Sequence, residues 1–380
     1  MSQRICPLFR GHFFPTGIVV ATVIAWFAIG VSVRAQDEAP VPGKVNTLEA
    51  MQLTSDMFRT AATKVEPSLV TIESWGGVGA REGKIGGIRK QGEGNTTGIV
   101  ISSDGYIITS TFNFITRPPI IMVVTRDNKR HTAKLQGRDD LRKICLLKIT
   151  DLADDETLVV PEIAPLEKIT VGHWALSMGV GYGDRSPAIS MGIISAKNRI
   201  GGRAIQTDAN ISPANYGGPL IDIDGQVMGI CVPMNPQSQA IGAGVEWYDS
   251  GIGFAIPLDG ADELLERLKD PDVKIAPAFL GIKSDPNPGG EGMWIAEVVP
   301  NSTAANAGLE RADVLMTVSG KPVGDLMGLK KVLIAFEAGQ KTTLEYLVQG
   351  KGDLVKKDIT FVPAPKSKNE IDQLEPPEIR

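Results

Sequence analysis

The chain has 380 residues, which is enough for two or three domains with cores of their own. With 42% hydrophobic and 22% charged residues the composition is that of a globular protein, and 42 Gly with 25 Pro indicate many turns, as in all-β folds. The formal net charge is −5 and no basic stripe runs along the sequence, so a nucleic-acid partner is not expected. No metal-ligand spacing is present, so no metal site is expected.

Residues 1–35 have the pattern of a targeting segment. Arg4 and Arg10 form a basic start, Thr16–Val33 is apolar, and Val33-Arg34-Ala35 has the small residues that signal peptidase prefers. The uncharged run Gly11–Val33 is also long enough to span a bilayer, so a retained N-terminal membrane anchor is the alternative. Either outcome predicts export to the periplasm or cell envelope.

Residues 36–64 are predicted to be a linker followed by a short helix. Gln36–Val45 is polar and contains Pro, and Leu48–Lys64 has apolar residues at helical spacing. Val65–Ile72 is then the first expected strand. Gly76–Gly98 is rich in glycine and mixed charge but lacks both nucleotide-binding glycine motifs, so it is interpreted as a surface loop and no cofactor is expected.

Two hairpins stand out in the next part of the chain. Thr97–Thr109 turns at Asp104-Gly105, and Leu220–Ile223 pairs with Val227–Val232 across the turn signal Asp224-Gly225. A calcium-loop interpretation of that second turn is weaker, because the later ligands are missing. Ile120–Thr125, Thr132–Gly137 and Ile144–Ile149 are further expected strands. Three later segments are expected strands because they resemble strands of the protein family described next: Val171–Gly179, Gly192–Ala196 and Gly251–Pro257. Two of the three cysteines, Cys145 and Cys231, lie in separate apolar strands and are expected to be buried free thiols.

The stretch Gln206–Cys231, QTDANISPANYGGPLIDIDGQVMGIC, resembles the nucleophile loop of the HtrA/DegP family of chymotrypsin-fold serine proteases. Thr97–Thr109 resembles the hairpin that precedes the catalytic histidine of that family, and Gly137–Ile149 resembles the segment that carries its catalytic acid. The resemblance implies a mainly β chain, with a chymotrypsin-like double six-stranded β-barrel over residues 65–258. A connecting helix and linker over 259–277, a PDZ domain (α+β) over 278–363 and a disordered tail over 364–380 complete the expected organisation.

The resemblance fails at the catalytic positions. The aligned nucleophile, base and acid are Tyr216, Phe112 and Lys143, and a shift of one residue at the base gives Thr111 or Asn113. Acyl transfer by this fold needs a hydroxyl nucleophile, an imidazole and a carboxylate that orients it, and none of the three is present. The former oxyanion loop is also altered, since Ala214, before Asn215, replaces a family glycine. No catalytic residue is assigned, and a degenerate, inactive protease (a pseudoprotease) is expected.

Substitute catalysts were sought among the remaining residues. Of the three histidines, His12 lies in the targeting segment, and His131 and His173 are expected in structural or surface roles. A Ser-Lys dyad with Lys143 as base would need a serine at the turn, and the available Ser212 and Ser68 are not there. A serine-type endopeptidase with a displaced, non-standard site is therefore kept as an alternative hypothesis.

The C-terminal part resembles a PDZ domain. Phe279-Leu280-Gly281-Ile282 is similar to the carboxylate-binding loop of that family, and Val298–Leu309 is similar to its V-x-P-x-S core. A peptide terminus would meet this loop and the helix Leu326–Phe336. The candidate peptide-binding residues are Phe279, Leu280, Gly281, Ile282, Leu329 and Leu333; that Leu329 and Leu333 only pack the core remains open.

The expected function follows from what the sequence retains. The chain is predicted to be an exported, inactive HtrA-like protein that binds peptide C-termini or unfolded proteins. It would act in envelope quality control, or as a scaffold or regulator of active HtrA proteases. A homotrimer, or a mixed assembly with active paralogues, is the expected state, because protease domains of this family form trimers. A purely structural envelope protein is the remaining alternative.

Overall fold

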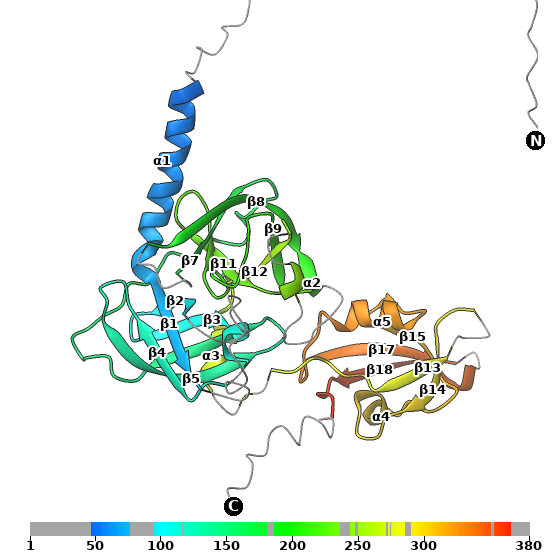
Figure 1. The fold of residues 1–380 in the computed structure, drawn as a ribbon. Coiled ribbons are helices and arrows are strands. Elements are labelled where there is room, and N and C mark those ends of the chain that lie inside the picture. The colour runs from blue at the N-terminus through cyan, green and yellow to red at the C-terminus, as the bar shows by residue number, and fades with distance from the viewer. Residues whose placement is uncertain are drawn as a thin grey trace, which may run out of the picture. The chain divides into compact units, whose positions relative to one another are not determined.

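The computed structural model describes residues 47–76, 95–115, 117–180, 186–235, 244–247, 250–270, 273, 275–285, 290–350 and 353–365 (Figure 1). The predicted targeting segment, the linker before residue 46, most of the glycine-rich loop and the end of the tail lie outside these residues. Within them, no helix combines the length and apolar character needed to cross a membrane.

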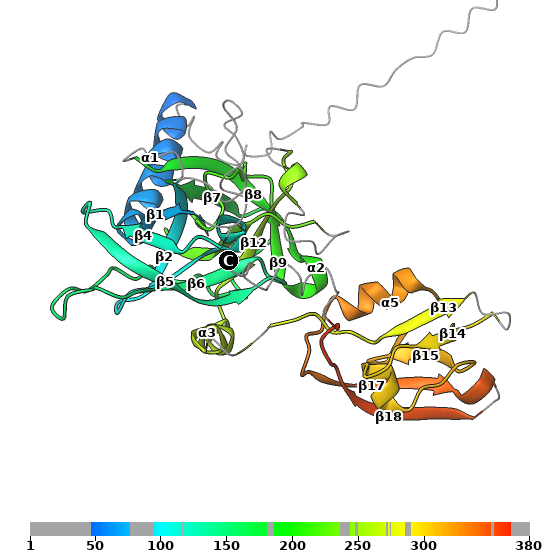
Figure 2. The ribbon, with the colours of Figure 1, turned by 60° about the horizontal axis from the view of Figure 1, so that its bottom comes forward.

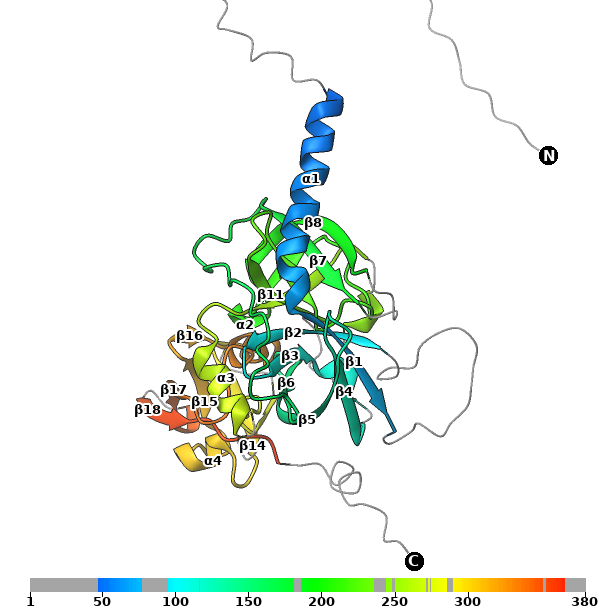
Figure 3. The same cartoon turned by 90° about the vertical axis from the view of Figure 1, so that its left-hand side faces the viewer.

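The predicted N-terminal helix is present as α1, Thr47–Val65 (Figure 3). Its last turns bury Ala61, Ala62 and Val65. The expectation that a strand starts at Val65 is wrong. A 3-10 turn over Glu66–Ser68 follows the helix, and β1 begins only at Leu69. Proline lacks the N–H that a strand ladder needs but fits the first turn of a helix, so Pro67 favours this arrangement.

Twelve described strands form two closed, six-stranded antiparallel barrels, which confirms the expected fold class. In the first barrel the strand order is β1-β2-β3-β6-β5-β4, and in the second it is β10-β11-β12-β9-β8-β7. The first-barrel strands are β1 Leu69–Trp75, β2 Thr96–Ser102, β3 Tyr106–Ser110, β4 Ile120–Val124, β5 Arg130–Asp139 and β6 Ile144–Ile149. The second-barrel strands are β7 Trp174–Gly179, β8 Ala188–Asn198, β9 Ala204–Thr207, β10 Pro219–Ile221, β11 Val227–Val232 and β12 Gly253–Pro257.

The strands are placed by their buried faces. Residues such as Val70, Ile107 and Leu147 fill the interior of the first barrel, and Ala175 and Leu220 are among those that fill the second. A further cluster combines residues of both barrels with α1 and with α3, Asp262–Lys269. Because alternate residues of a strand point to opposite faces, one face fills the barrel and the other contributes to this shared cluster. Cys145 and Cys231 are buried free thiols, as expected.

Among the predicted strands that are shorter than expected, two have a visible cause. Strand β10 ends at Ile221, not Ile223, because Asp222 Oδ1 accepts hydrogen bonds from the backbone N–H groups of Asp224 and Gln226 at 3.0 and 2.8 Å. The hairpin loop is therefore longer than the two residues expected from Asp224-Gly225. Strand β7 starts at Trp174, since a turn closed by His173 N–H to the Thr170 carbonyl at 3.2 Å precedes it.

The C-terminal domain contains a six-stranded antiparallel sheet of order β13-β14-β15-β17-β18, with β16 paired to β15 (Figure 2). Its core includes Leu280, Ile295, Leu315, Leu344 and Phe361. The expected helix over Leu326–Phe336 ends earlier, at Leu333. The elements are β13 Ile282–Asp285, β14 Met293–Val298, α4 Thr303–Ala307, β15 Val314–Val318, β16 Lys321–Pro322, α5 Leu326–Leu333, β17 Lys341–Leu347 and β18 Leu354–Thr360. A short turn, α2 Arg199–Gly202, joins β8 to β9.

Candidate functional site

The structure brings two of the three aligned triad positions together as an aromatic pair. Phe112 lies in the 3-10 helix Thr111–Phe114 after β3, and Tyr216 lies in the turn before β10. Their ring centroids are 5.1 Å apart, with planes at 75°. This edge-to-face geometry is the favoured one for aromatic rings, because the positive edge of one meets the negative face of the other. A hydrophobic contact therefore joins the two residues that the sequence resemblance aligns with the nucleophile and its base.

The pair is closed to solvent. Tyr216 is 2% exposed and Phe112 is 7% exposed. A cavity beside Tyr216, lined also by Ile211, Met234 and Phe254, has a volume of only about 10 Å³. That is room for about one water molecule. The space next to the nucleophile position is therefore filled by the protein's own side chains.

Asn113 connects the two turns that carry the aromatic pair. Its Nδ2 donates to Thr109 Oγ1 at 3.1 Å and to the Tyr216 carbonyl at 3.2 Å. Asn113 is 1% exposed and Thr111 is fully buried. Neither of these two alternatives for the base position therefore faces solvent. Asn113 holds the Tyr216 turn in place as a structural residue.

The former oxyanion loop is folded so that its amides are used internally. In chymotrypsin-fold proteases the oxyanion hole is made by the N–H groups of the nucleophile and of the residue two before it, positions that the sequence resemblance aligns with Tyr216 and Ala214. Tyr216 N–H donates to the Ser212 carbonyl at 3.0 Å, and Ala214 N–H donates to Ser212 Oγ at 3.3 Å. The amide between them, of Asn215, also donates to the Ser212 carbonyl at 3.0 Å. Both hole-forming amides therefore already have acceptors.

Asn215 fixes the loop in this arrangement. Its Oδ1 accepts from Ser212 N–H at 2.6 Å, and its Nδ2 donates to Ser177 Oγ at 3.0 Å and to the Asn210 carbonyl at 3.2 Å. Sequence reasoning missed the roles of Ser212 and of the Asn215 side chain. No pattern of residue types could have revealed them, because they depend on the direction of individual peptide planes.

Lys143, at the acid position, is almost completely buried, at 2% exposed, and has a positive φ of 60°. Burial lowers its pKa to about 8, since the charged ammonium loses water; nearby Asp140 opposes this change and Arg138 adds to it. The Lys143 carbonyl accepts from Thr111 N–H at 2.9 Å and from Ser110 Oγ at 3.2 Å. The backbone of Lys143 therefore supports the 3-10 helix that carries Phe112.

The nearby acids do not replace the missing carboxylate. Asp139 is fully buried and accepts from the backbone N–H of Leu141 and Arg142 at 2.9 and 3.0 Å. Arg142 Nη1 pairs with Asp139 at 2.8 Å and with Glu337 at 2.5 Å. Burial raises the pKa of Asp139, and Arg142 opposes the rise. Asp140 pairs with Arg138 at 2.6 Å. These groups serve ion pairs and turns.

The other candidate catalysts lie in structural places. His131 is 5% exposed on β5, with Nδ1 3.6 Å from Asp151 and Nε2 3.8 Å from Glu156. His173 is exposed just before β7, and Ser68 is fully buried. None of these residues belongs to the elements that carry Phe112 or Tyr216.

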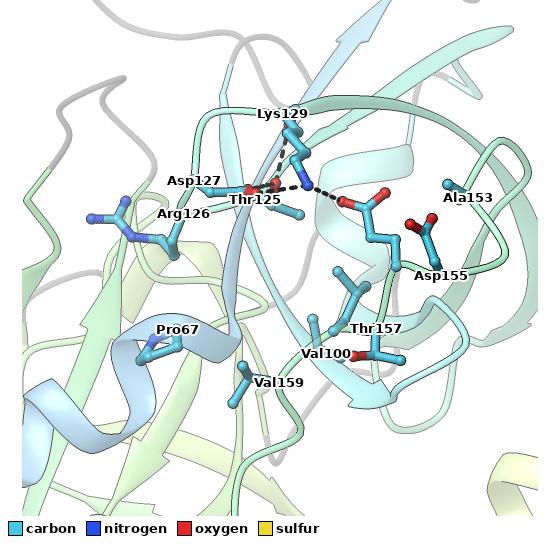
Figure 4. Close-up of a pocket in the computed structure, with 12 residues that line it drawn as sticks. Pro67, Val100, Thr125, Arg126, Asp127, Lys129, Ala153, Asp155, Thr157 and Val159 are labelled. Carbon is cyan, nitrogen blue, oxygen red and sulfur yellow. Dashed lines mark hydrogen bonds and ion pairs between the residues drawn. The ribbon is translucent and has the colours of Figure 1, made fainter.

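A cavity of about 610 Å³ opens elsewhere, on the first barrel (Figure 4). Pro67 and Val100 contribute apolar surface, and Lys129 spans the opening through ion pairs to Asp127 at 3.2 Å and to Glu156 at 2.7 Å. None of the triad positions lines it. This cavity is thus separate from the Phe112–Tyr216 pair and from Lys143.

The predicted carboxylate-binding loop of the C-terminal domain, Phe279–Ile282, is held by its carbonyl groups. The Phe279 carbonyl accepts from Thr303 Oγ1 at 2.6 Å, the Leu280 carbonyl from Ala304 N–H at 2.9 Å, and the Gly281 carbonyl from Val299 N–H at 2.8 Å. Gly281 has a φ of +78°, and an added Cβ would lie 2.2 Å from the Cβ of a neighbouring serine. Only glycine fits this turn.

The two helix residues predicted for the groove differ in burial. Leu329 is 3% exposed and belongs to the domain core, whereas Leu333 is half-buried and packs against that core. Ile282, on β13, is also half-buried against the same core. Leu333 and Ile282 are therefore better placed than Leu329 to contact a ligand.

Comparison with known families and proteins gives two matched regions. Residues 96–230 match the trypsin-like peptidase domain, and residues 271–347 match the PDZ domain. A probable periplasmic serine endoprotease, DegP-like, of Chlamydia muridarum is 31% identical over 284 residues, covering 70% of this chain and 54% of the relative. The periplasmic pH-dependent serine endoprotease DegQ of Escherichia coli is 33% identical over 276 residues, covering 68% and 58%. The chain spans little more than half the length of these curated relatives.

Solved structures show the same similarity. The serine endoprotease from Yersinia pestis has a TM-score of 0.59 at 26% identity, covering 81% of this chain and 98% of that one. An HtrA-type protease, AlgW with a decapeptide, has a TM-score of 0.58 at 25% identity, covering 82% and 99%. The similarity therefore extends over both the barrels and the C-terminal domain.

Proposed function

Because the chain carries an HtrA/DegP-family trypsin-like domain followed by a PDZ domain, we propose that it is a peptide-binding member of that group without protease activity. Its PDZ domain would bind peptide C-termini or the exposed ends of unfolded chains. It would act in envelope protein quality control, as a scaffold or as a regulator of active HtrA proteases.

The observation that carries the inactive assignment is the closed nucleophile loop. Loss of the nucleophile or base of such a triad alone lowers turnover by a factor on the order of 10⁶, and a residual rate would rest on the oxyanion hole. Here the amides of Ala214 and Tyr216 are already bonded to Ser212. The Phe112–Tyr216 pair also fills the site. Without a catalytic triad, and without free amides to bind an oxyanion, no source of catalytic rate is left.

Peptide binding is supported by the loop Phe279–Ile282. Its carbonyl groups at Phe279, Leu280 and Gly281 are bonded to α4 and to the end of β14, which fixes the orientation of the peptide planes. Successive N–H groups in such a turn can bind a carboxylate. Strand β13 is at one end of the sheet order, so an extended ligand could add beside it as a further strand.

The periplasmic names of the relatives support an exported, cell-envelope location. We also propose a homotrimer or a mixed assembly with active HtrA proteins. Exposed apolar residues of α1, among them Met51 and Leu53, offer surface for such contacts. Co-purification of a tagged chain with an active relative tests the mixed assembly, and recovery of homo-oligomers only would count against it.

Inactivity is tested by casein and peptide hydrolysis with purified Gln36–Arg380, together with labelling by a fluorophosphonate probe. We expect neither cleavage nor labelling. A variant with Phe112→His, Lys143→Asp, Tyr216→Ser and Ala214→Gly serves as the comparison, because any activity it gains would verify the assignment of the positions. Cleavage by the natural chain that Tyr216→Ala abolishes would refute the proposal.

Binding is tested by fluorescence anisotropy with peptides that end in an apolar residue. Each peptide is compared with its C-terminally amidated form, which has the same side chains but no terminal carboxylate. We expect saturable binding of the free acid and much weaker binding of the amide. Equal affinities would show that the loop Phe279–Ile282 does not bind a terminal carboxylate.

A further inference from the structure

We infer that the first barrel carries a second binding site, which takes an internal stretch of unfolded polypeptide with a lysine or arginine among apolar residues. The site combines the cavity of about 610 Å³ on this barrel with the segment Thr157–Val160, part of which lines that cavity. It goes beyond the proposed binding of C-termini, because a ligand here needs no terminal carboxylate.

Val159 and Val160 present backbone groups that a ligand can pair with. They lie in the connection between the two barrels, after β6, in a segment that forms no helix, turn or strand. The segment is anchored at both ends, because Leu158 N–H donates to the Ser103 carbonyl at 3.1 Å and the Glu162 carbonyl accepts from the first N–H of β11 at 2.8 Å. Between these anchors, the N–H and carbonyl groups of both valines have no hydrogen bond to any residue that the structure describes. Unpaired backbone that is held in place can act as a template for an added strand.

Apolar side chains are exposed at the same place. Val159 is 53% exposed and Val160 is 43% exposed. Val159 also lines the cavity, together with Pro67 and Val100 (Figure 4). The cavity volume lies in the range of ligand pockets, and this apolar surface suits the aliphatic stem of a lysine or arginine side chain.

The rim of the cavity has an excess of negative charge. The charged residues that line it are Asp127, Asp155, Glu156, Arg126 and Lys129. Arg126 is paired with Glu66 at 2.6 Å, so with Glu66 included four carboxylates surround two cations. Asp155 is exposed and has no ion pair or hydrogen bond with the described residues. A positively charged ligand group is therefore favoured over a negative one.

Lys129 shows which chemical group the rim binds. Its Nζ lies 2.7 Å from Glu156 and 3.2 Å from Asp127, so these two carboxylates already hold an ammonium group of the protein itself. Asp155 lies across the opening from Arg126 (Figure 4). Asp155 is therefore the carboxylate that is left for an ammonium or guanidinium group of the ligand.

A free amine, such as a polyamine, would share this charge but not the backbone of a polypeptide. Only a polypeptide can also pair with the backbone groups of Val159 and Val160. The two features together therefore assign the ligand as a segment of protein chain, bound along its length.

The test uses the full chain and labelled octapeptides that are acetylated and amidated, so that the loop Phe279–Ile282 has no carboxylate to bind. The peptides alternate Val and Ser around one central residue, which is Lys, Gln or Glu. We expect fluorescence anisotropy to show that the Lys peptide binds about two- to fivefold more tightly than the Gln peptide, the range of an exposed ion pair. The Glu peptide should bind most weakly, and the preference should shrink in high salt.

Two neighbouring acids provide a matched pair of variants. Asp155→Asn should bring the affinities of the Lys and Gln peptides together, and should leave urea unfolding unchanged because Asp155 has no partner to lose. Asp154 is also exposed but does not line the cavity, so Asp154→Asn should keep the preference for Lys. Equal effects of the two variants would show a response to net charge and would refute a contact at Asp155.

Strand pairing is tested with two further Lys peptides, N-methylated on alternate amides in the two possible phases. One of them should lose most of its binding, because the methyl groups remove the N–H donors that face the segment. Unchanged affinity of both would refute the strand pairing. Displacement of the Lys peptide by cadaverine, at the concentrations at which the unlabelled peptide displaces it, would identify the ligand as a free amine and overturn the assignment to a protein chain.

Two broader results would also overturn the inference. Equal affinities of the Lys, Gln and Glu peptides would show that the acidic rim does not select the ligand. Absence of binding by every amidated peptide would refute the second site. Neither result affects the binding of free C-termini, which is measured separately with the unamidated peptides.

Discussion

The burial of Lys143 can be tested directly by the pH dependence of stability. Burial lowers its pKa from 10.5 to about 8, so the folded state binds a proton less tightly than the unfolded chain does. Below pH 8 both states are protonated and folding carries the full cost of burying an ammonium group. Between pH 8 and 10.5 the folded state releases its proton first, so stability rises with pH through this window.

The size of the effect follows from the two pKa values. A change from 10.5 to about 8 corresponds to about 3 kcal/mol, of which about 2.5 kcal/mol should be recovered between pH 7 and pH 10. Lys143→Met keeps the length of the side chain and removes the titration. We expect its stability relative to the natural chain to fall by about 2.5 kcal/mol as pH rises from 7 to 10.

The assay is urea unfolding of both proteins at several pH values, with the difference in unfolding free energy plotted against pH. Groups common to both proteins cancel in this difference. Lys134→Met, at an exposed position of β5, is the matched control and should show no such slope. If the unfolding free energy of Lys143→Met relative to the natural chain is independent of pH, or rises with pH, the assignment of Lys143 as a buried ammonium is refuted.

Three further changes test the two sites. Tyr216→Ala should lower the unfolding free energy by about 3–5 kcal/mol because it leaves a cavity, and a loss under 1 kcal/mol in urea unfolding would contradict the filled site. Asn215→Ala removes one acceptor and two donor contacts of the nucleophile loop, so we expect a loss of about 1–3 kcal/mol, checked the same way; no change would mean that the loop holds without it. Gly281→Ala should abolish binding of free C-terminal peptides in the anisotropy assay, whereas Gly320→Ala, which has a positive φ but open space around it, should retain binding; retention in both would place the ligand elsewhere.

Much of the fold could be predicted because it depends on local patterns. Apolar runs of strand length and the Asp-Gly turn signals located both hairpins, although Asp222 extended the second loop by accepting two backbone hydrogen bonds. The apolar pattern places the start of β1 too early, at Val65, because Pro67 favours a 3-10 turn over a strand. Boundaries of this kind depend on single hydrogen bonds, which the pattern of residue types does not record.

Only part of the candidate site could be predicted from the sequence. That Phe112 and Tyr216 occupy triad positions could be inferred by resemblance, and their contact follows from it. The pKa of Lys143 could not be predicted because it depends on burial. The acceptors of the loop amides could not be predicted because they depend on the orientation of the peptide planes.

The hydrogen bonds that Ser212 accepts also affect how many substitutions would be needed to build a catalytic site in this loop. After a single substitution, Tyr216→Ser or Phe112→His, the backbone amides of residues 214 and 216 would still donate to Ser212. Such a step would give no activity for selection to favour, and removing Tyr216 would cost stability at once. A protease site at this position would therefore need changes in side chains and backbone together.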